Sequence, residues 1–156
     1  MTVRESSLLT DVGLSLRHHA LRPVYGLATE TRRVATASGS YGVVDLNTIS
    51  GGDNLGQAIV MRLLTPRGEL AALGHAEYGS RLHELVGTPS TETSRNLAKL
   101  YILESLAQEP RIAEVLELRV DPGLHDRGEV DVLLRVKPVG ETGTVSIGPF
   151  TLEFAR

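Results

Sequence analysis

The sequence predicts an α+β fold in which helices pack on a C-terminal antiparallel β-meander, preceded by an irregular N-terminal arm. Two observations carry this prediction. In the middle of the chain apolar residues recur at helical spacing, with Leu55, Ile59 and Leu63 on one face. After residue 111 apolar and polar residues alternate, as they do in half-buried strands. Breaks at "DPG" and "KPVGETG" divide this part into three strands.

The first 50 residues show no single period. Val12 and Leu16 fit a helical stripe, and together with Leu14 they fit a strand equally well. Residues 28–40 are rich in Thr, Arg, Ala and Ser. We therefore expect an N-terminal arm or extension over residues 1–50 and an α+β domain over residues 51–156.

Two helix starts can be placed from their capping residues. Asn54 is a suitable N-cap, with Gln57 at the position from which a side chain reaches back to the cap. Thr88, followed by a proline, predicts the start of the main helix, which should end near Gln108. This helix is apolar over most of the circumference of its second half, so a partner is expected to cover part of it.

The three predicted strands each have an expected face. In the first strand the expected inward residues are Leu116, Leu118 and Val120. In the second strand they are Val130, Val132, Leu134 and Val136. Gly148-Pro149 interrupts the third strand, residues 144–154, which is therefore expected at an edge or at a bulge.

Composition excludes several classes of function. The net charge of -3 gives no basic excess for phosphate contacts, so nucleic-acid binding is not expected. The chain has no Cys, which excludes disulfides and thiolate metal sites and fits a reducing cytoplasm. No apolar run approaches the ~20 residues of a membrane span, so membrane insertion is not expected.

No catalytic or metal site emerges from the motifs. The adjacent His18 and His19 are more simply solvated than metal-binding, and the other three histidines are dispersed. A glycosidase needs two carboxylates. The candidate carboxylates are Glu69, Glu77, Glu84, Glu104 and Glu109. No spacing singles out a pair among them, so we expect no catalytic residue, no metal and no cofactor.

The order of several short motifs resembles the baseplate wedge and sheath-initiator family of contractile tails. That family includes the phage wedge protein once labelled a tail lysozyme, a type VI secretion baseplate subunit, and counterparts in extracellular contractile injection systems. The matching motifs are Arg62-Leu63-Leu64-Thr65, the Thr65-x-x-Gly68 turn, Tyr78-Gly79-Ser80 and Glu109-Pro110-Arg111. The resemblance covers about residues 53–136 and does not extend to residues 1–50.

The resemblance implies a structural role without enzymatic activity. It implies binding to the wedge core bundle through Glu109, Pro110 and Arg111, and nucleation of the first ring of sheath protein, with tube or hub proteins as further partners. The implied location is the cytoplasm of the producing cell, within the baseplate of the assembled particle. A peptidoglycan-cleaving glycosidase of lysozyme type is the alternative from another class. Phage tail and injection system remain open alternatives.

Glu109-Pro110-Arg111 also has an interpretation from the residues alone. Pro110 disfavours helical geometry at Glu109 and so ends the helix. Arg111 offers a planar fork of donors that suits a carboxylate or carbonyls. We expect both charges to face a partner. The alternative is that Glu109 and Arg111 satisfy the helix end or each other.

Overall fold

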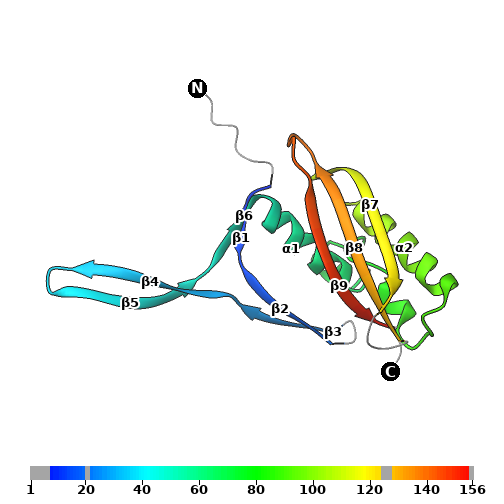
Figure 1. The fold of residues 1–156 in the computed structure, drawn as a ribbon, viewed down its shortest axis with the longest axis horizontal. Helices are drawn as coiled ribbons and strands as arrows, with labels where there is room; N and C mark the ends of the chain where they lie inside the picture. The colour runs from blue at the N-terminus through cyan, green and yellow to red at the C-terminus, as the bar shows by residue number, and fades with distance from the viewer. Residues whose placement is uncertain (1–7, 20–21, 124–127, 155–156) are drawn as a thin grey trace.

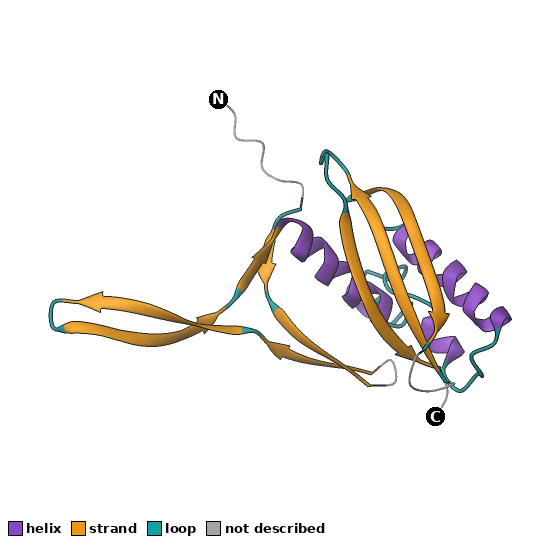
Figure 2. Cartoon of the chain, in the orientation of Figure 1, coloured by secondary structure: helices purple, strands orange, loops and turns teal. Residues whose placement is uncertain are grey.

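A computed structural model describes residues 8–19, 22–123 and 128–154. It contains a body of helices and sheet from which a narrow β-ribbon extends (Figures 1 and 2). The α+β class and the C-terminal antiparallel meander are confirmed. The segment before residue 51 is not irregular, because it forms paired strands. None of the helices among the described residues is long and apolar enough to cross a membrane.

The body consists of one sheet with helices on one face. The sheet is formed by β7 (Ile112–Pro122), β8 (Glu129–Pro138) and β9 (Val145–Glu153), in the order β7-β8-β9. Helices α1 (Gly51–Leu64) and α2 (Glu92–Leu106) contact β9 and β7 respectively. Two short 3-10 helices, η1 (Ala71–Leu73) and η2 (Leu82–Leu85), lie between α1 and α2 in the chain.

The core lies between the sheet and the helices. The predicted inward residues of β8, from Val130 to Val136, are completely buried. Leu55, Ile59 and Leu63 of α1 are also buried, so the predicted helical face is confirmed. The periods of apolar residues in the strand and the helix predict these positions, because one face of each element must be buried.

Strand β7 departs from simple alternation. Its pairing with β8 shifts register between Val115 and Glu117, which marks a β-bulge. Val115 and Leu118 therefore pack against the core, whereas Leu116 is exposed. The expectation that Leu116 faces inward is wrong, because the extra residue in a bulge inverts the faces before it.

Strand β9 is the predicted edge strand. Its only strand pairing among the described residues is with β8, and the register shifts near Gly148. Gly148 has a φ of +97°, and a Cβ there would lie 2.5 Å from the Val132 carbonyl oxygen. The break in the apolar pattern thus marks a bulge on an edge strand, as expected. Ile147 and Leu152 of this strand are buried, as is Phe154 directly after it, so this edge strand is also part of the core.

Both helices begin elsewhere than their expected caps. The N-cap of α1 is Ser50, so Asn54 lies inside the first turn. The N-cap of α2 is Thr91, which forms a reciprocal capping box with Ser94. Thr88 instead donates its hydroxyl to the Leu85 carbonyl at the end of η2. The expected starts at Asn54 and Thr88 were therefore wrong. Side chains of this kind form hydrogen bonds with the backbone of turns and loops as readily as with a helix N-terminus.

The N-terminal segment is a branched set of antiparallel ribbons. A short stem pairs β1 (Thr10–Val12) with β6 (Thr48–Ser50). Between these strands lie two hairpins. They are β2 (Leu14–His19) with β3 (Arg22–Leu27), and β4 (Thr29–Thr36) with β5 (Gly39–Leu46). The irregular arm was predicted from the Thr, Arg, Ala and Ser content of residues 28–40, but Thr together with the Val and Tyr residues of this segment is typical of strands.

A cycle of three backbone hydrogen bonds joins the stem to the two hairpins. Gly13 donates to the Asn47 carbonyl, Asn47 donates to the Ala28 carbonyl, and Ala28 donates to the Gly13 carbonyl, with distances of 2.7–2.9 Å. A Cβ at Gly13 would lie 3.3 Å from the Asn47 carbonyl oxygen, so the close approach favours glycine. The junction therefore fixes where the hairpins leave the body.

Side-chain amides of α1 attach this segment to the body. Asn54 donates through Nδ2 to the Leu8 carbonyl at 2.7 Å, and Leu8 is buried in the core. Gln57 donates to the Val12 carbonyl at 3.0 Å and accepts from the Leu14 amide at 2.7 Å. The two residues expected to cap the helix thus bind the N-terminal strands instead.

Candidate functional site

The predicted partner-binding residues lie in the turn between α2 and β7, which we call the corner (residues 107–111). Helix α2 ends at Leu106, and the Glu109 amide donates to the Leu106 carbonyl at 3.0 Å. The Arg111 carbonyl accepts from the Val139 amide at 2.9 Å, which connects the corner to the end of β8. Pro110 is exposed at the apex of this turn.

The structure brings Glu109 and Arg111 together. Arg111 donates from Nε to Glu109 Oε1 at 2.6 Å. The side chain of Glu109 is only 5% exposed, whereas that of Arg111 is 22% exposed. Glu109 therefore points into the body, and Arg111 and Pro110 form the accessible part of the motif.

A second arginine completes the cluster from a distant part of the chain. Arg62, in the last turn of α1, donates from Nη2 to Glu109 Oε2 at 3.3 Å. Its guanidinium carbon lies 4.4 Å from the centre of the Tyr78 ring, in a cation–π contact. Arg62 Nε is buried without a hydrogen-bond partner in the described part of the chain. One carboxylate thus faces two guanidinium groups, which leaves the cluster with a net positive charge.

Sequence reasoning did not assign Arg62 and Tyr78 to this site. A signal for Arg62 exists, because it lies three residues after Ile59 and seven after Leu55, on the buried face of α1. A charged residue at such a position needs a buried partner of opposite charge. Nothing in the sequence identifies that partner as Glu109.

Ionisation of Glu109 follows from this environment. Burial raises the pKa of the Glu109 carboxyl, but the hydrogen bonds and charge of Arg111, with the charge of Arg62, outweigh that effect. The net pKa lies below the ordinary value of 4.5. Burial also raises the pKa of the neighbouring Tyr78 phenol, and the charge of Arg62 partly offsets this rise.

We expect the Glu109 cluster to make stability depend on pH in the acid range. A carboxyl with a depressed folded-state pKa stabilises the fold fully above its unfolded pKa. That stabilisation is lost as the pH falls through the lower folded-state value. The free energy of unfolding of the natural chain should therefore fall more steeply below about pH 5 than that of Glu109→Gln. Urea titrations at several pH values measure the free energy of unfolding of both proteins. An equal dependence on pH in the two would contradict the expectation.

Beside the cluster lies an open depression of about 340 Å³. Arg62, Tyr78, Gln108 and the loop residues Gly74–Glu77 line it. His75 contributes to this lining, but no group of three or more potential metal ligands occurs among the described residues. His18 and His19 lie in β2, and their side chains are outside the described set. His125 also lies outside the described residues.

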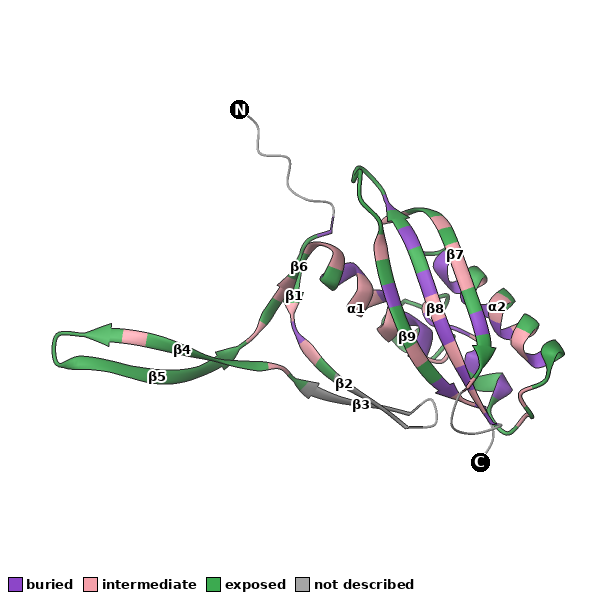
Figure 3. Ribbon diagram, in the orientation of Figure 1, coloured by how far each residue is buried: buried purple, intermediate pink, exposed green. Residues whose placement is uncertain are grey.

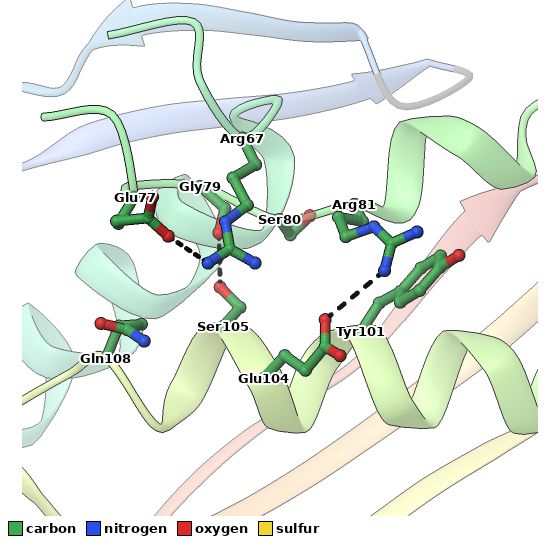
Figure 4. Close-up of a pocket in the computed structure, with 9 residues that line it drawn as sticks. All are labelled: Arg67, Glu77, Gly79, Ser80, Arg81, Tyr101, Glu104, Ser105 and Gln108. Carbon is green, nitrogen blue, oxygen red and sulfur yellow. Dashed lines mark hydrogen bonds and ion pairs between the residues drawn. The ribbon is translucent and has the colours of Figure 1, made fainter. Parts of the chain in front are cut away.

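A neighbouring slot is lined by two of the candidate glycosidase carboxylates, Glu77 and Glu104 (Figure 4). Glu77 pairs with Arg67, and Glu104 pairs with Arg81 at 3.9 Å. Arg81 also pairs with a third candidate, Glu84, at 2.8 Å. The slot has no room for a water-sized molecule, because the side chains that line it fill it.

Further contacts hold the same slot closed. Tyr101 donates its hydroxyl to Glu84 Oε2 at 3.0 Å, and its ring lies 4.3 Å from the Arg81 guanidinium carbon. Ser105 donates to the Gly79 carbonyl at 2.9 Å (Figure 4). The hydrogen bond from Arg81 lowers the pKa of the Glu84 carboxyl. A glycosidase general acid requires the opposite shift.

Comparison with known proteins identifies a similar fold. No protein-family model matches the chain, and no curated protein matches it. The chain is similar to the crystal structure, at 1.44 Å resolution, of a Geobacter sulfurreducens protein provisionally named tail lysozyme. The TM-score is 0.54 and the identity 22%, over 65% of this chain and 90% of the other. At this identity the likeness establishes a shared fold.

Proposed function

We propose that this chain is a structural, non-enzymatic component of the baseplate of a contractile tail or injection system. In this proposal the corner binds the wedge core bundle, and the sheet edge starts sheath assembly. The observation that carries the proposal is the fold shared with a protein named for a tail, over 90% of that protein. The corner and the edge strand add features that suit assembly.

The accessible side of the corner fits a docking role. Arg111 is oriented by its hydrogen bond to Glu109, while part of its side chain remains exposed. A second positive charge, on Arg62, competes for the same carboxylate. A partner carboxylate at Arg111 would neutralise the excess charge. Glu109 then positions Arg111 and does not itself touch the partner.

The outer edge of β9 offers the second contact. Its outer backbone groups have no ladder partner among the described strands, although β2 lies beside part of β9. An added strand could pair there through main-chain hydrogen bonds. Because Ile147, Leu152 and Phe154 are buried, β9 cannot be removed without loss of core, so only point changes at its exposed positions test this contact.

Lysozyme activity is the second candidate, because the similar protein carries that name. The described carboxyls whose pKa is shifted, Glu84 and Glu109, both have a lowered value, and both are already paired with arginines. Glu69, another candidate carboxylate, is exposed in the turn after α1. These observations favour the structural role. A cell-wall hydrolysis assay with pure protein separates the two, and turnover abolished by one Glu→Gln change would reverse the choice.

The structural role is tested by reconstitution with the wedge subunits and the sheath protein of the same particle. We expect the chain to co-purify with the core-bundle subunits and to be required for sheath growth on baseplates. Sheaths of normal length on baseplates that lack this chain would contradict the proposal.

We expect Arg111→Ala to weaken partner binding much more than folding. Loss of one member of an interfacial charge pair costs about 2–5 kcal/mol of binding, roughly a 30-fold or larger loss of affinity. The fold should lose only about 1 kcal/mol, because Arg62 still pairs with Glu109. Thermal unfolding and co-purification with wedge subunits measure the two effects.

Arg119→Ala provides the matched control for this change. Arg119 also pairs with a glutamate, Glu117, but on the outer face of the sheet with a side chain that is 63% exposed. Arg119→Ala should change neither partner binding nor the stability of the fold. Arg111→Lys should restore binding only in part, since an ammonium cannot make a two-pronged contact. A large loss of stability with binding intact would show that the corner serves only as an internal helix stop.

A further inference from the structure

The hairpin β4–β5 extends from the body with little cover. All but one of its strand residues are exposed, and Val34 is half-buried (Figure 3). Its exposed apolar side chains include Tyr41, Val43, Val44 and Leu46. Among the described strands, β4 and β5 pair only with each other. A two-stranded ribbon alone is marginally stable in water, so an added strand would stabilise this hairpin.

The hairpin also carries two arginines that have no partner among the described residues. Arg32 and Arg33 make neither an ion pair nor a side-chain hydrogen bond to any of these residues. Every described arginine of the body has such a contact. These are Arg62, Arg67, Arg81, Arg95, Arg111, Arg119 and Arg135.

The register places one of these arginines on each face of the ribbon. Arg32 is opposite Val43, and Arg33 is opposite Gly42. Since neighbouring residues in a strand point to opposite faces, Arg32 lies with Tyr41 and Val43, and Arg33 lies with Val44. A strand added beside β4 would therefore meet a positive charge on both of its faces.

The same arrangement disfavours a second copy at this edge. If two β4 strands paired antiparallel over their full length, Arg32 of each would lie opposite Arg33 of the other. Like charges directly opposite each other in a ladder are destabilising. Strand β4 also carries Glu30, on the same face as Arg32, and strand β5 carries only Asp45, so the positive charges of the hairpin lie on β4 alone.

We propose that the outer edge of β4 accepts an extended strand from another protein subunit, with two consecutive acidic residues opposite Arg32 and Arg33. Main-chain hydrogen bonds along the eight residues of Thr29–Thr36 supply the pairing. The two arginines favour this register and disfavour the full-length pairing of two β4 strands. This surface is separate from the corner and from β9, so the inference does not depend on the proposed function.

The test is a peptide titration of the full isotope-labelled chain followed by amide NMR signals. The probe is a ten-residue peptide of alternating Thr and Val with Asp-Glu at its centre, and the comparison peptide has Lys-Lys there. At millimolar concentrations the acidic peptide should shift the signals of Thr29–Thr36 more than those of β9. It should bind about tenfold more tightly than the lysine peptide.

Variants assign the preference to the two arginines. The double variant Arg32→Glu with Arg33→Glu should reverse the preference for the acidic peptide, so that the lysine peptide binds more tightly. The double variant Lys99→Glu with Lys137→Glu makes the same change of charge on the body. It should leave the preference for the acidic peptide unchanged. Absence of shifts in β4, equal affinity for both peptides, or shifts that map to β9 would overturn the proposal. Sedimentation that shows dimers broken by the Arg32→Glu, Arg33→Glu variant would overturn it in favour of a second copy.

Discussion

Glu109→Ala should destabilise the isolated protein by about 3 kcal/mol, because it leaves buried Arg62 without its carboxylate. Arg62 is 8% exposed, and its Nε already lacks a hydrogen-bond partner in the described part of the chain. Removal of one member of a buried ion pair is costly because the remaining charge stays away from water. For a chain of this size the melting temperature should fall by about 6–12 °C.

The matched control is Glu77→Ala, which removes a carboxylate from the Arg67 pair. The side chain of Glu77 is 71% exposed, so its loss should cost less than about 1 kcal/mol. The double change Arg62→Met with Glu109→Gln should recover part of the stability, because it removes both buried charges together. Equal melting temperatures for the natural chain and Glu109→Ala would show that Arg62 reaches water.

Gly79→Ala should also destabilise the fold by about 3 kcal/mol, because conformational strain and overpacking add at this position. Gly79 has a φ of +105°, and a Cβ there would lie 2.5 Å from the Thr65 carbonyl oxygen and 2.9 Å from the Pro66 carbonyl carbon. These backbone atoms are held by the hydrogen bonds between Thr65–Arg67 and Ser80, so they cannot move aside cheaply.

Gly74→Ala separates the two causes. Gly74 has a φ of +85°, but a Cβ at this position would have no neighbour within 4 Å. Its substitution should cost only the conformational part, about 1 kcal/mol. Chemical denaturation of both variants measures the difference. Equal losses would mean that the close approach of Gly79 to Thr65 does not contribute.

The α+β class and the inward face of β8 followed from the sequence because they depend on short-range period alone. Val130, Val132, Leu134 and Val136 are apolar at every second position, and Asp131 and Arg135 lie between them, so any fold that buries one face of that strand must bury the apolar positions. The break at Gly148-Pro149 likewise indicated an edge, since proline cannot donate to a ladder. The bulge in β7 was missed because nothing local distinguishes Val115 from Leu116 as the inward residue.

The N-terminal ribbons and the helix starts show where local signals are ambiguous. Asn54 and Gln57 have the chemistry of a capping pair, and the same amides serve instead to hold Leu8, Val12 and Leu14. Such side chains bind whichever backbone groups are near and unsatisfied. The position of the N-terminal strands determines which groups those are.

For the Glu109-Pro110-Arg111 motif, too, the sequence determined one property and the tertiary structure another. The sequence alone determined that the helix ends before Pro110, since proline disfavours helical geometry at the residue before it, and the helix ends at Leu106. Only the tertiary structure decided that Glu109 points inward, because its second partner, Arg62, lies 47 residues away in the chain. Burial of a charge depends on the elements that approach it, and no local period encodes the approach of α1 to the end of α2.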